Sequence, residues 1–244
     1  MAESLDKNTK IAQIGQRHIL YDAALIEHPD EDLFLPKSSA QTDGVAKTAK
    51  GRGEAVFFER DGIDLVLKHY HRGGMAEKWL GDRYLGFNPE KTRSFREWRL
   101  LKHLRAEELP APVPVAACII KNGLFYRADL ITREIKHAST LADLLLQGEL
   151  DQKTWLAVGH CIRQFHDRDV YHDDLNARNI LIDKTGIVYL IDFDKGYVRY
   201  MSSAWKAANL ARLNRSLLKF KSKNRDFYFN SGDWKALLSG YGSM

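Results

Sequence analysis

The sequence has few cysteines and no long apolar run. Its 244 residues include two cysteines, Cys118 and Cys161, both in apolar surroundings. A disulfide framework or a cysteine metal site is therefore not indicated, and we expect buried thiols in a reducing compartment. No apolar stretch reaches the roughly 18 residues that a membrane-spanning helix needs. The polar N-terminus lacks the apolar core of a signal peptide. These absences predict a soluble globular protein without a signal peptide or transmembrane helix.

Acidic residues are missing from one long stretch. Between Lys195 and Arg225 there is no Asp or Glu, and the whole chain has a net charge of +5. Such a stretch is either a solvated helix face or a face for anionic partners, and the missing counter-charges favour an anionic membrane surface. Its main cations are Arg212, Arg215, Lys219, Lys221, Lys223 and Arg225. Aromatic residues interleave with these cations only sparsely, so no nucleic acid partner is expected.

The order of the expected elements predicts an α+β fold with two lobes, an antiparallel-sheet N-lobe and a mainly helical C-lobe. Period-two and apolar segments predict strands at 55–58, 64–68, 116–120 and 124–132, and helical periodicity predicts helices at 94–104, 141–146, 151–166 and after 192. Residues 1–40 are expected to be an N-terminal extension that joins the N-lobe, with one short strand or helix around 11–25. The N-lobe takes 41–133 and the C-lobe 134–244, and a cleft is expected beside the connection between them.

Two polar clusters, each bracketed by β-branched apolar residues, carry the chemistry. Asp174 precedes Asn179 by five residues, and Asn179 precedes Asp192 by thirteen. One Asp in a loop is usually a turn or capping residue, but three such positions between short buried strands rarely agree by accident. The spacing indicates phosphoryl transfer. Asp174 would orient the acceptor hydroxyl, and Asn179 and Asp192 would bind Mg²⁺ through oxygen.

These motifs resemble the protein-kinase-like superfamily, whose catalytic loop reads H-R-D-x-x-x-x-N and whose metal motif reads D-F-G. Here they read His172-Asp173-Asp174…Asn179 and Asp192-Phe193-Asp194. Asp173 replaces the Arg through which many protein kinases sense a phosphorylated activation loop. Asp194 replaces the Gly, no A-P-E motif follows, and little chain remains for a protein-substrate platform. The differences favour a small-molecule or glycan acceptor.

More narrowly, the chain resembles the 3-deoxy-D-manno-octulosonic acid (Kdo) kinases of lipopolysaccharide assembly. The resembling segments are 20–23, 51–55, 67–74, 171–179, 192–196 and 209–213. The resemblance implies an ATP-dependent kinase that phosphorylates the 4-hydroxyl of Kdo on Kdo-lipid A precursor, an anionic glycolipid. It also implies a Gram-negative source and a peripheral position at the cytoplasmic face of the inner membrane.

The resemblance implies that residues of the N-lobe bind the phosphates of the nucleotide. Lys68, which closes an apolar strand, would grip the α- and β-phosphates of ATP, and Gly51 and Gly53 would lay backbone N–H groups over them. Glu97 is the candidate partner of Lys68. The alternative for Glu97 is capping, because Ser94 and Glu97 have the spacing of a capping box.

Two arginines are candidate acceptor contacts. Arg178 directly precedes Asn179 and would face the transferred phosphate or the acceptor's carboxylate. Arg72 belongs to an insert of Gly, Arg and aromatic residues, which is either a surface hairpin or a lid over an anionic sugar. His172 is interpreted as a structural residue that hydrogen-bonds backbone near the metal motif.

Other functions stay open at this point. One alternative is a kinase for another hydroxyl acceptor, namely a core heptose, an aminoglycoside or a protein. A second is a non-catalytic binder, either a pseudokinase or a nucleic-acid module. Pseudokinases usually lose a base or metal residue, whereas this chain keeps Asp174, Asn179 and Asp192.

Overall fold

The computed structural model describes residues 7–35, 48–49, 55–70, 84–85, 88–122, 125–199 and 204–242. Three of the predicted site residues, Gly51, Gly53 and Arg72, lie outside these residues.

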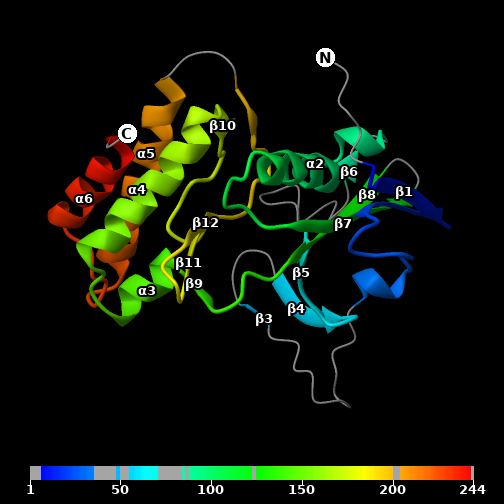
Figure 1. Cartoon of the computed structure of the whole chain (residues 1–244), viewed down its shortest axis with the longest axis horizontal. Helices are drawn as coiled ribbons and strands as arrows, with labels where there is room; N and C mark the ends of the chain where they lie inside the picture. Colours follow the sequence, from blue (N-terminus) through cyan, green and yellow to red (C-terminus); the bar gives the residue numbers. More distant parts are fainter. Residues whose placement is uncertain are drawn as a thin grey trace. The chain divides into compact units, whose positions relative to one another are not determined.

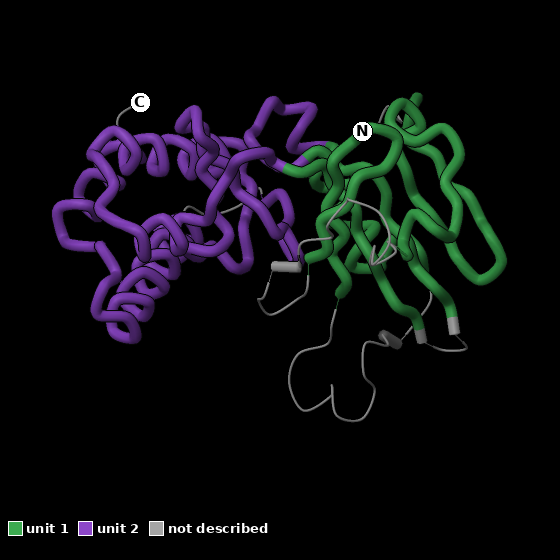
Figure 2. The backbone as a smooth tube through the Cα atoms, turned by 90° about the horizontal axis from the view of Figure 1, so that it is seen from below, with its two compact units in different colours: residues 1–102, 113–134 green, residues 103–112, 135–244 purple. Residues whose placement is uncertain are grey.

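The chain forms two compact units (Figure 2). The first contains residues 1–102 and 113–134, and the second contains 103–112 and 135–244. The sequence pattern does not suggest that residues 103–112 belong with the second unit. In this unit the Leu190 N–H donates to the Pro110 carbonyl over 3.1 Å, which ties this short segment to a strand far along the chain.

The first unit contains one antiparallel sheet. Its elements, with 3₁₀ helices written η, are β1 (Thr9–Ile14), β2 (Arg17–Asp22), η1 (Asp32–Phe34), β3 (Thr48–Ala49), β4 (Ala55–Arg60), β5 (Ile63–His69), β6 (Tyr84–Leu85), η2 (Pro89–Lys91), α2 (Arg93–Ala106), β7 (Pro114–Asn122) and β8 (Phe125–Arg133). The strand order is β1-β2-β7-β8-β5-β4-β3, and β6 also pairs with β8 (Figure 1). The strands predicted between 55 and 132 are therefore present.

The N-terminal extension adds two strands to this sheet. The segment predicted to form one short strand or helix is the hairpin of β1 and β2, and β2 pairs with β7. The hairpin turns at Gly15, whose φ of 56° lies in the left-handed region that glycine adopts without strain. The sequence pattern predicts one element here because both apolar runs are short, and the turn at Gly15 divides this segment into two strands.

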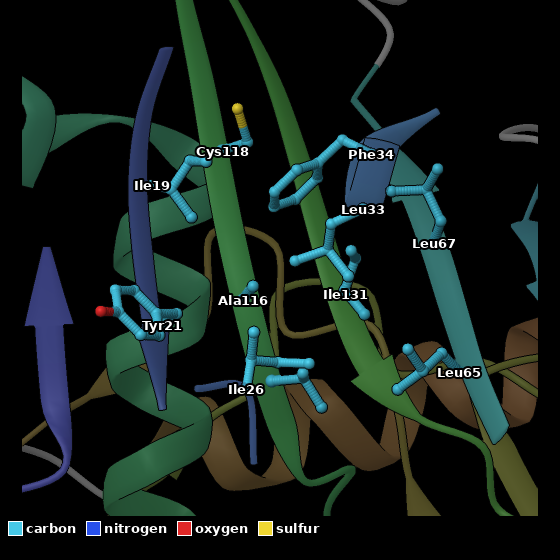
Figure 3. Packing of buried hydrophobic residues seen from close by; sticks show 11 residues of the cluster. Ile19, Tyr21, Ile26, Leu33, Phe34, Leu65, Leu67, Ala116, Cys118 and Ile131 are labelled. Carbon is cyan, nitrogen blue, oxygen red and sulfur yellow. The ribbon is translucent and has the colours of Figure 1, made fainter. Parts of the chain in front are cut away.

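The sheet has a buried core on the face that η1 covers. Figure 3 shows Leu33 and Phe34 of η1 over the strands, near Ile131 and Leu67. Successive strand residues point to opposite faces, so the neighbour of Leu67, Lys68, points to the other face. On that face its ammonium group contacts a residue of α2.

Helix α2 contradicts the predicted capping box. The helix begins at Arg93, one residue before the proposed cap. The Ser94 hydroxyl is buried and donates to the Cys118 carbonyl over 3.3 Å, while the Glu97 carboxylate binds Lys68. The capping-box interpretation is wrong because both side chains point into the unit, where tertiary partners are available.

The second unit contains the other predicted helices and three short strand pairs. Its elements are β9 (Ala138–Thr140), α3 (Leu141–Gln147), α4 (Gln152–Asp167), β10 (Val170–Tyr171), β11 (Ile180–Asp183), β12 (Val188–Leu190), β13 (Tyr197–Val198), α5 (Ala204–Lys223) and α6 (Ser231–Gly242). Strand β10 pairs with β13, and β11 lies between β12 and β9. Together the two units confirm the predicted α+β class.

Glycines allow α4 and α6 to approach closely (Figure 1). A Cβ atom built on Gly159 of α4 would lie 2.1 Å from the Leu237 carbonyl oxygen. A Cβ atom on Gly240 of α6 would lie 2.2 Å from the Leu156 carbonyl oxygen. No side chain fits at either position without moving a backbone.

Among the helices that the structure describes, none has both the length and the apolar character needed to cross a bilayer.

Candidate functional site

The loop that carries Asp174 lies between β10 and β11. The Asp174 side chain is exposed, with a relative exposure of 60%. The loop around it is fixed by polar contacts with its neighbours. The Asn179 Nδ2 donates to the Asp174 carbonyl over 2.9 Å, and the Asn179 N–H donates to the Asn176 carbonyl over 3.0 Å. An exposed carboxylate is thus presented by a firmly held backbone.

His172 ties this loop to the segment before Asp192. The Asp174 N–H donates to Nδ1 of His172 over 3.2 Å, so Nδ1 carries no proton. The proton must then be on Nε2, which donates to the Ile191 carbonyl over 2.9 Å. Both contacts are made by the neutral imidazole. His172 is buried, and its ring packs on Phe193 at 4.8 Å between centroids. These contacts fit the structural role predicted for His172.

Strand pairing brings Asn179 and Asp192 to neighbouring strand ends. Ile180 of β11 faces Leu190 of β12, and the Ile191 N–H donates to the Asn179 carbonyl over 3.0 Å. Asp192 follows directly and has a φ of 63°, a left-handed conformation that is uncommon for residues other than glycine. Strained backbone of this kind is often found at functional sites.

Oxygen chemistry makes this pair suitable for Mg²⁺. Because Nδ2 of Asn179 donates to the loop, its Oδ1 remains as an acceptor, and Asp192 supplies a carboxylate. Among the described residues, no group of three or more His, Cys, Asp or Glu side chains has the arrangement of a metal site. Mg²⁺ usually binds to one or two protein oxygens and completes its shell with phosphates and water, so the pair fits this ion.

One face of α5 contacts the loop along its length. Asn209 makes two hydrogen bonds with the backbone of His172, its Nδ2 donating to the carbonyl over 3.0 Å and its Oδ1 accepting from the N–H over 3.4 Å. The Arg212 guanidinium lies 3.5 Å from the Asp174 carboxylate. Further along, the Ser216 hydroxyl accepts from the Ala177 N–H over 3.3 Å.

Arg178 packs on the same helix. Its side chain is exposed, and its guanidinium carbon lies 5.3 Å from the centre of the Phe220 ring. This is a cation–π geometry, which leaves the head group at the protein surface. The role of Arg178 as an acceptor contact stays a prediction.

The first unit holds Lys68 through Glu97. The Lys68 Nζ donates to both carboxylate oxygens of Glu97, over 3.1 and 2.9 Å. The Tyr70 hydroxyl donates to the same carboxylate, and the Tyr70 ring lies 4.6 Å from the Lys68 Nζ. Glu97 is buried, with 4% exposure, so its charge is compensated by these donors. The ion pair that the sequence left open against capping is present.

Strand pairing also places Lys68 beside the residue that follows the glycine segment. Ala55 of β4 is the register partner of Lys68 in β5. Gly51 and Gly53, which precede Ala55 by a few residues, lie outside the described residues. Their role in phosphate binding stays a prediction, as does that of Arg72.

Three residues of these two clusters are not predicted as site residues by the sequence. Tyr70 lies two residues after Lys68, and nothing in the local pattern indicates that its hydroxyl is a partner of Glu97. Asn209 and Arg212 lie in a segment that carries the family resemblance; the sequence assigns Arg212 only to the cations that favour an anionic surface and gives Asn209 no role. Their spacing of three residues on a helix places them on one face, which is the signal that was available.

Comparison with known proteins decides the family. The model of the lipopolysaccharide kinase (Kdo/WaaP) family matches residues 38–241. This chain belongs to that family. Membership confirms the predicted kinase-like fold and the predicted class of enzyme, a phosphotransferase acting on an alcohol group, and implies ATP as the phosphate donor.

Individual relatives agree over most of the chain. A 3-deoxy-D-manno-octulosonic acid kinase of Photobacterium profundum is 40% identical over 225 residues, which cover 92% of this chain and 94% of the relative. A protein of the same name from Vibrio vulnificus is 38% identical over 232 residues, or 95% and 98% of the two chains. One from Xylella fastidiosa is 38% identical over 210 residues, or 84% and 82%.

Proposed function

We propose that this protein phosphorylates the 4-hydroxyl of Kdo on Kdo-lipid A precursor, with ATP as donor, in lipopolysaccharide inner-core biosynthesis. The names of its relatives, at 38–40% identity over most of both chains, support Kdo as the acceptor. The observation that carries the proposal is the loop of Asp174, which His172 and Asn179 lock to the segment of Asp192.

Asp174 is the base in this reaction. Its exposed carboxylate accepts the proton of the acceptor hydroxyl as that oxygen forms a bond to the γ-phosphorus of ATP. The bond between the γ-phosphorus and its bridging oxygen breaks, and ADP leaves with the electron pair. A fixed loop backbone limits the positions that the Asp174 carboxylate can take, which favours in-line attack.

The remaining site residues bind the donor. Asn179 and Asp192 would hold Mg²⁺, which when bound neutralises charge on the phosphates. Lys68 contacts the α- and β-phosphates as a cation held in place by Glu97 and Tyr70. The glycines Gly51 and Gly53 complete the phosphate contacts with their backbone N–H groups.

Mass spectrometry tests the acceptor. Incubation of Kdo-lipid A precursor with ATP, Mg²⁺ and the protein should add one phosphate. Asp174→Asn should lower the rate by about 10²–10⁴-fold, the usual loss for a removed general base. Asp226→Asn removes an exposed surface carboxylate and should leave the rate unchanged. Labelling of a core heptose, an aminoglycoside or a protein, without labelling of the Kdo acceptor, would contradict the proposal.

The cations of α5 and its C-terminal end suit a lipid-anchored acceptor. Lys219, Lys223 and Arg225 are exposed, and none of their side chains has an ion-pair or hydrogen-bond partner among the described residues. We propose that they hold the protein at the cytoplasmic face of the inner membrane as a peripheral protein. Each cation near an anionic bilayer contributes about 1 kcal/mol.

Vesicle binding tests this attachment. Replacing Lys219, Lys223 and Arg225 together by Gln should lower partition onto phosphatidylglycerol vesicles by roughly 100-fold at low salt. The matched control replaces three exposed lysines that lie outside α5 by Gln: Lys153, Lys184 and Lys235. Equal losses for the two triple variants would show that net charge, rather than α5, controls binding.

A further inference from the structure

The contacts of α5 raise a question about Arg212. Asn209, Arg212 and Ser216 recur at the spacing of one helix face, and each meets the loop from His172 to Ala177. Asn209 and Ser216 hydrogen-bond to backbone, so they fix the loop. Arg212 instead meets the Asp174 side chain, the group that acts on the acceptor.

The pair between Arg212 and Asp174 is loose. Its N–O distance of 3.5 Å is longer than a charge-assisted hydrogen bond, and the two side chains are 44% and 60% exposed. Among the residues described, the Arg212 side chain has no other ion-pair or hydrogen-bond partner. Exposed pairs of this kind contribute little to stability. Most of the five N–H donors of Arg212 are therefore available to a ligand beside the catalytic carboxylate.

We propose that Arg212 binds the carboxylate of the acceptor sugar, an inference that rests on the proposed function. A hydroxyl that donates to Asp174 lies about 3 Å from its carboxylate, and so within roughly 7 Å of the Arg212 guanidinium. In Kdo, one ring carbon separates the carbon that bears the 4-hydroxyl from the carbon that bears the carboxylate. The planar guanidinium matches a carboxylate with two parallel hydrogen bonds.

The charges around the loop favour such a cation. Asp173, Asp174, Asp192 and Asp194 all belong to the two motifs, so an acidic acceptor meets several carboxylates there. Arg178 is the arginine within the loop itself, but its guanidinium is stacked on Phe220. Of these two arginines, Arg212 is the one whose guanidinium lies beside the Asp174 carboxylate. It is a specificity-determining residue: it selects acidic sugars.

Steady-state kinetics with two acceptors tests the assignment. The acceptors are Kdo-lipid A precursor and the same compound with the Kdo carboxylate converted to its methyl ester. With the acid, Arg212→Gln should raise KM for the acceptor by about 10–100-fold and leave KM for ATP unchanged. The wild-type protein should lose a similar factor when the ester replaces the acid. Arg212→Gln should distinguish poorly between the two acceptors.

Control measurements separate the possible failures. Lys235→Gln, on the surface of α6, should behave as wild type with both acceptors. A loss in Arg212→Gln that is equal for acid and ester would show that Arg212 acts only through Asp174, and would overturn the assignment. No loss at all would overturn it too. A wild-type protein that phosphorylates neither acceptor would instead overturn the proposed function together with this inference.

Discussion

Glu97 is a buried carboxylate whose charge depends on two neighbours. Lys68 and Tyr70 both donate to it, and Lys68 is itself partly exposed, at 27%. Breaking a buried pair costs more than removing both members, because the partner left behind keeps its charge without compensation. Lys68, which is proposed to bind phosphate, therefore also stabilises the first unit.

Replacing Lys68 should therefore affect folding as well as activity. Lys68→Met should abolish detectable phosphorylation and lower the free energy of unfolding by about 1–3 kcal/mol, because Glu97 loses its charged donor. In the double variant Lys68→Met with Glu97→Gln, part of the stability should return while activity stays absent. Chemical denaturation measures the free energy. Equal stability of the single and double variants would contradict a buried, uncompensated charge.

Asn209 acts on the catalytic loop without touching the acceptor. Its carboxamide makes two hydrogen bonds with the His172 backbone, and its side chain is buried at 1% exposure. Asn209→Leu keeps the volume and removes both bonds, so the loop should shift; it also removes the side-chain hydrogen bond of Asn209 with His166. We expect kcat to fall ten- to a hundredfold while KM for ATP stays within about twofold, because small displacements of a catalytic group are costly.

The matched control for Asn209 lies on the same helix. Asn214 is half-buried, and its side chain makes no hydrogen bond with any residue that the structure describes. Asn214→Leu should leave kcat unchanged in the same assay. If thermal unfolding of Asn209→Leu falls while kcat does not, Asn209 stabilises the fold but does not position the loop.

At the scale of elements, the contact of α4 with α6 depends on two glycines. Gly159→Ala and Gly240→Ala should each lower the free energy of unfolding by about 2 kcal/mol or more, since the added methyl group meets a backbone carbonyl that cannot move alone. Gly242→Ala, at the open end of α6, has no atom within 4 Å of its added Cβ and should change stability by less than about 0.5 kcal/mol. Urea denaturation of the three variants measures the difference.

The sequence predicts elements better than it predicts their partners. The strands around Lys68 and the helix of Trp155 follow from local apolar patterns, and these are present. The capping box fails because Ser94 and Glu97 have partners 24 and 29 residues away, which a local pattern cannot indicate.

The candidate site shows the same division. The motif spacing singles out Asp174, because its neighbours in the loop are close in sequence. The helix that holds this loop lies beyond the next motif, and Asn209 is 37 residues from its partner His172. One sequence without a structure does not show which face of a helix meets which loop. The contacts of Asn209 and Arg212 with the catalytic loop can therefore be identified only from the structure.

At the scale of the whole molecule, one buried histidine makes stability depend on pH. His166 of α4 is buried beside α5 and α6: its ring lies 4.9 Å from that of Trp205, and its Nδ1 lies 2.9 Å from the Tyr241 hydroxyl. Burial lowers the pKa of His166 from 6.5 to about 4. The folded protein therefore holds this imidazole neutral where the unfolded chain would bind a proton.

The direction of the effect follows from proton linkage. The contribution of His166 is fully present above about pH 6.5 and is lost as pH falls from 6.5 towards 4. The loss amounts to about 3 kcal/mol, from 1.4 kcal/mol per pKa unit. His166→Gln has no titrating ring, so its free energy of unfolding should vary less over this range. Denaturation at several pH values compares the two proteins, and parallel pH curves would contradict the prediction.

The division of labour along α5 has an evolutionary consequence. Asn209 and Ser216 hold the catalytic loop through its backbone, whereas Arg212, on the same face of the helix, meets the side chain of Asp174. An exchange at Arg212 therefore leaves the backbone contacts of the loop in place. With the role proposed for Arg212, a change of sugar preference needs one side chain of α5 rather than a new loop, and a designer who wishes to redirect the enzyme can randomise that position first.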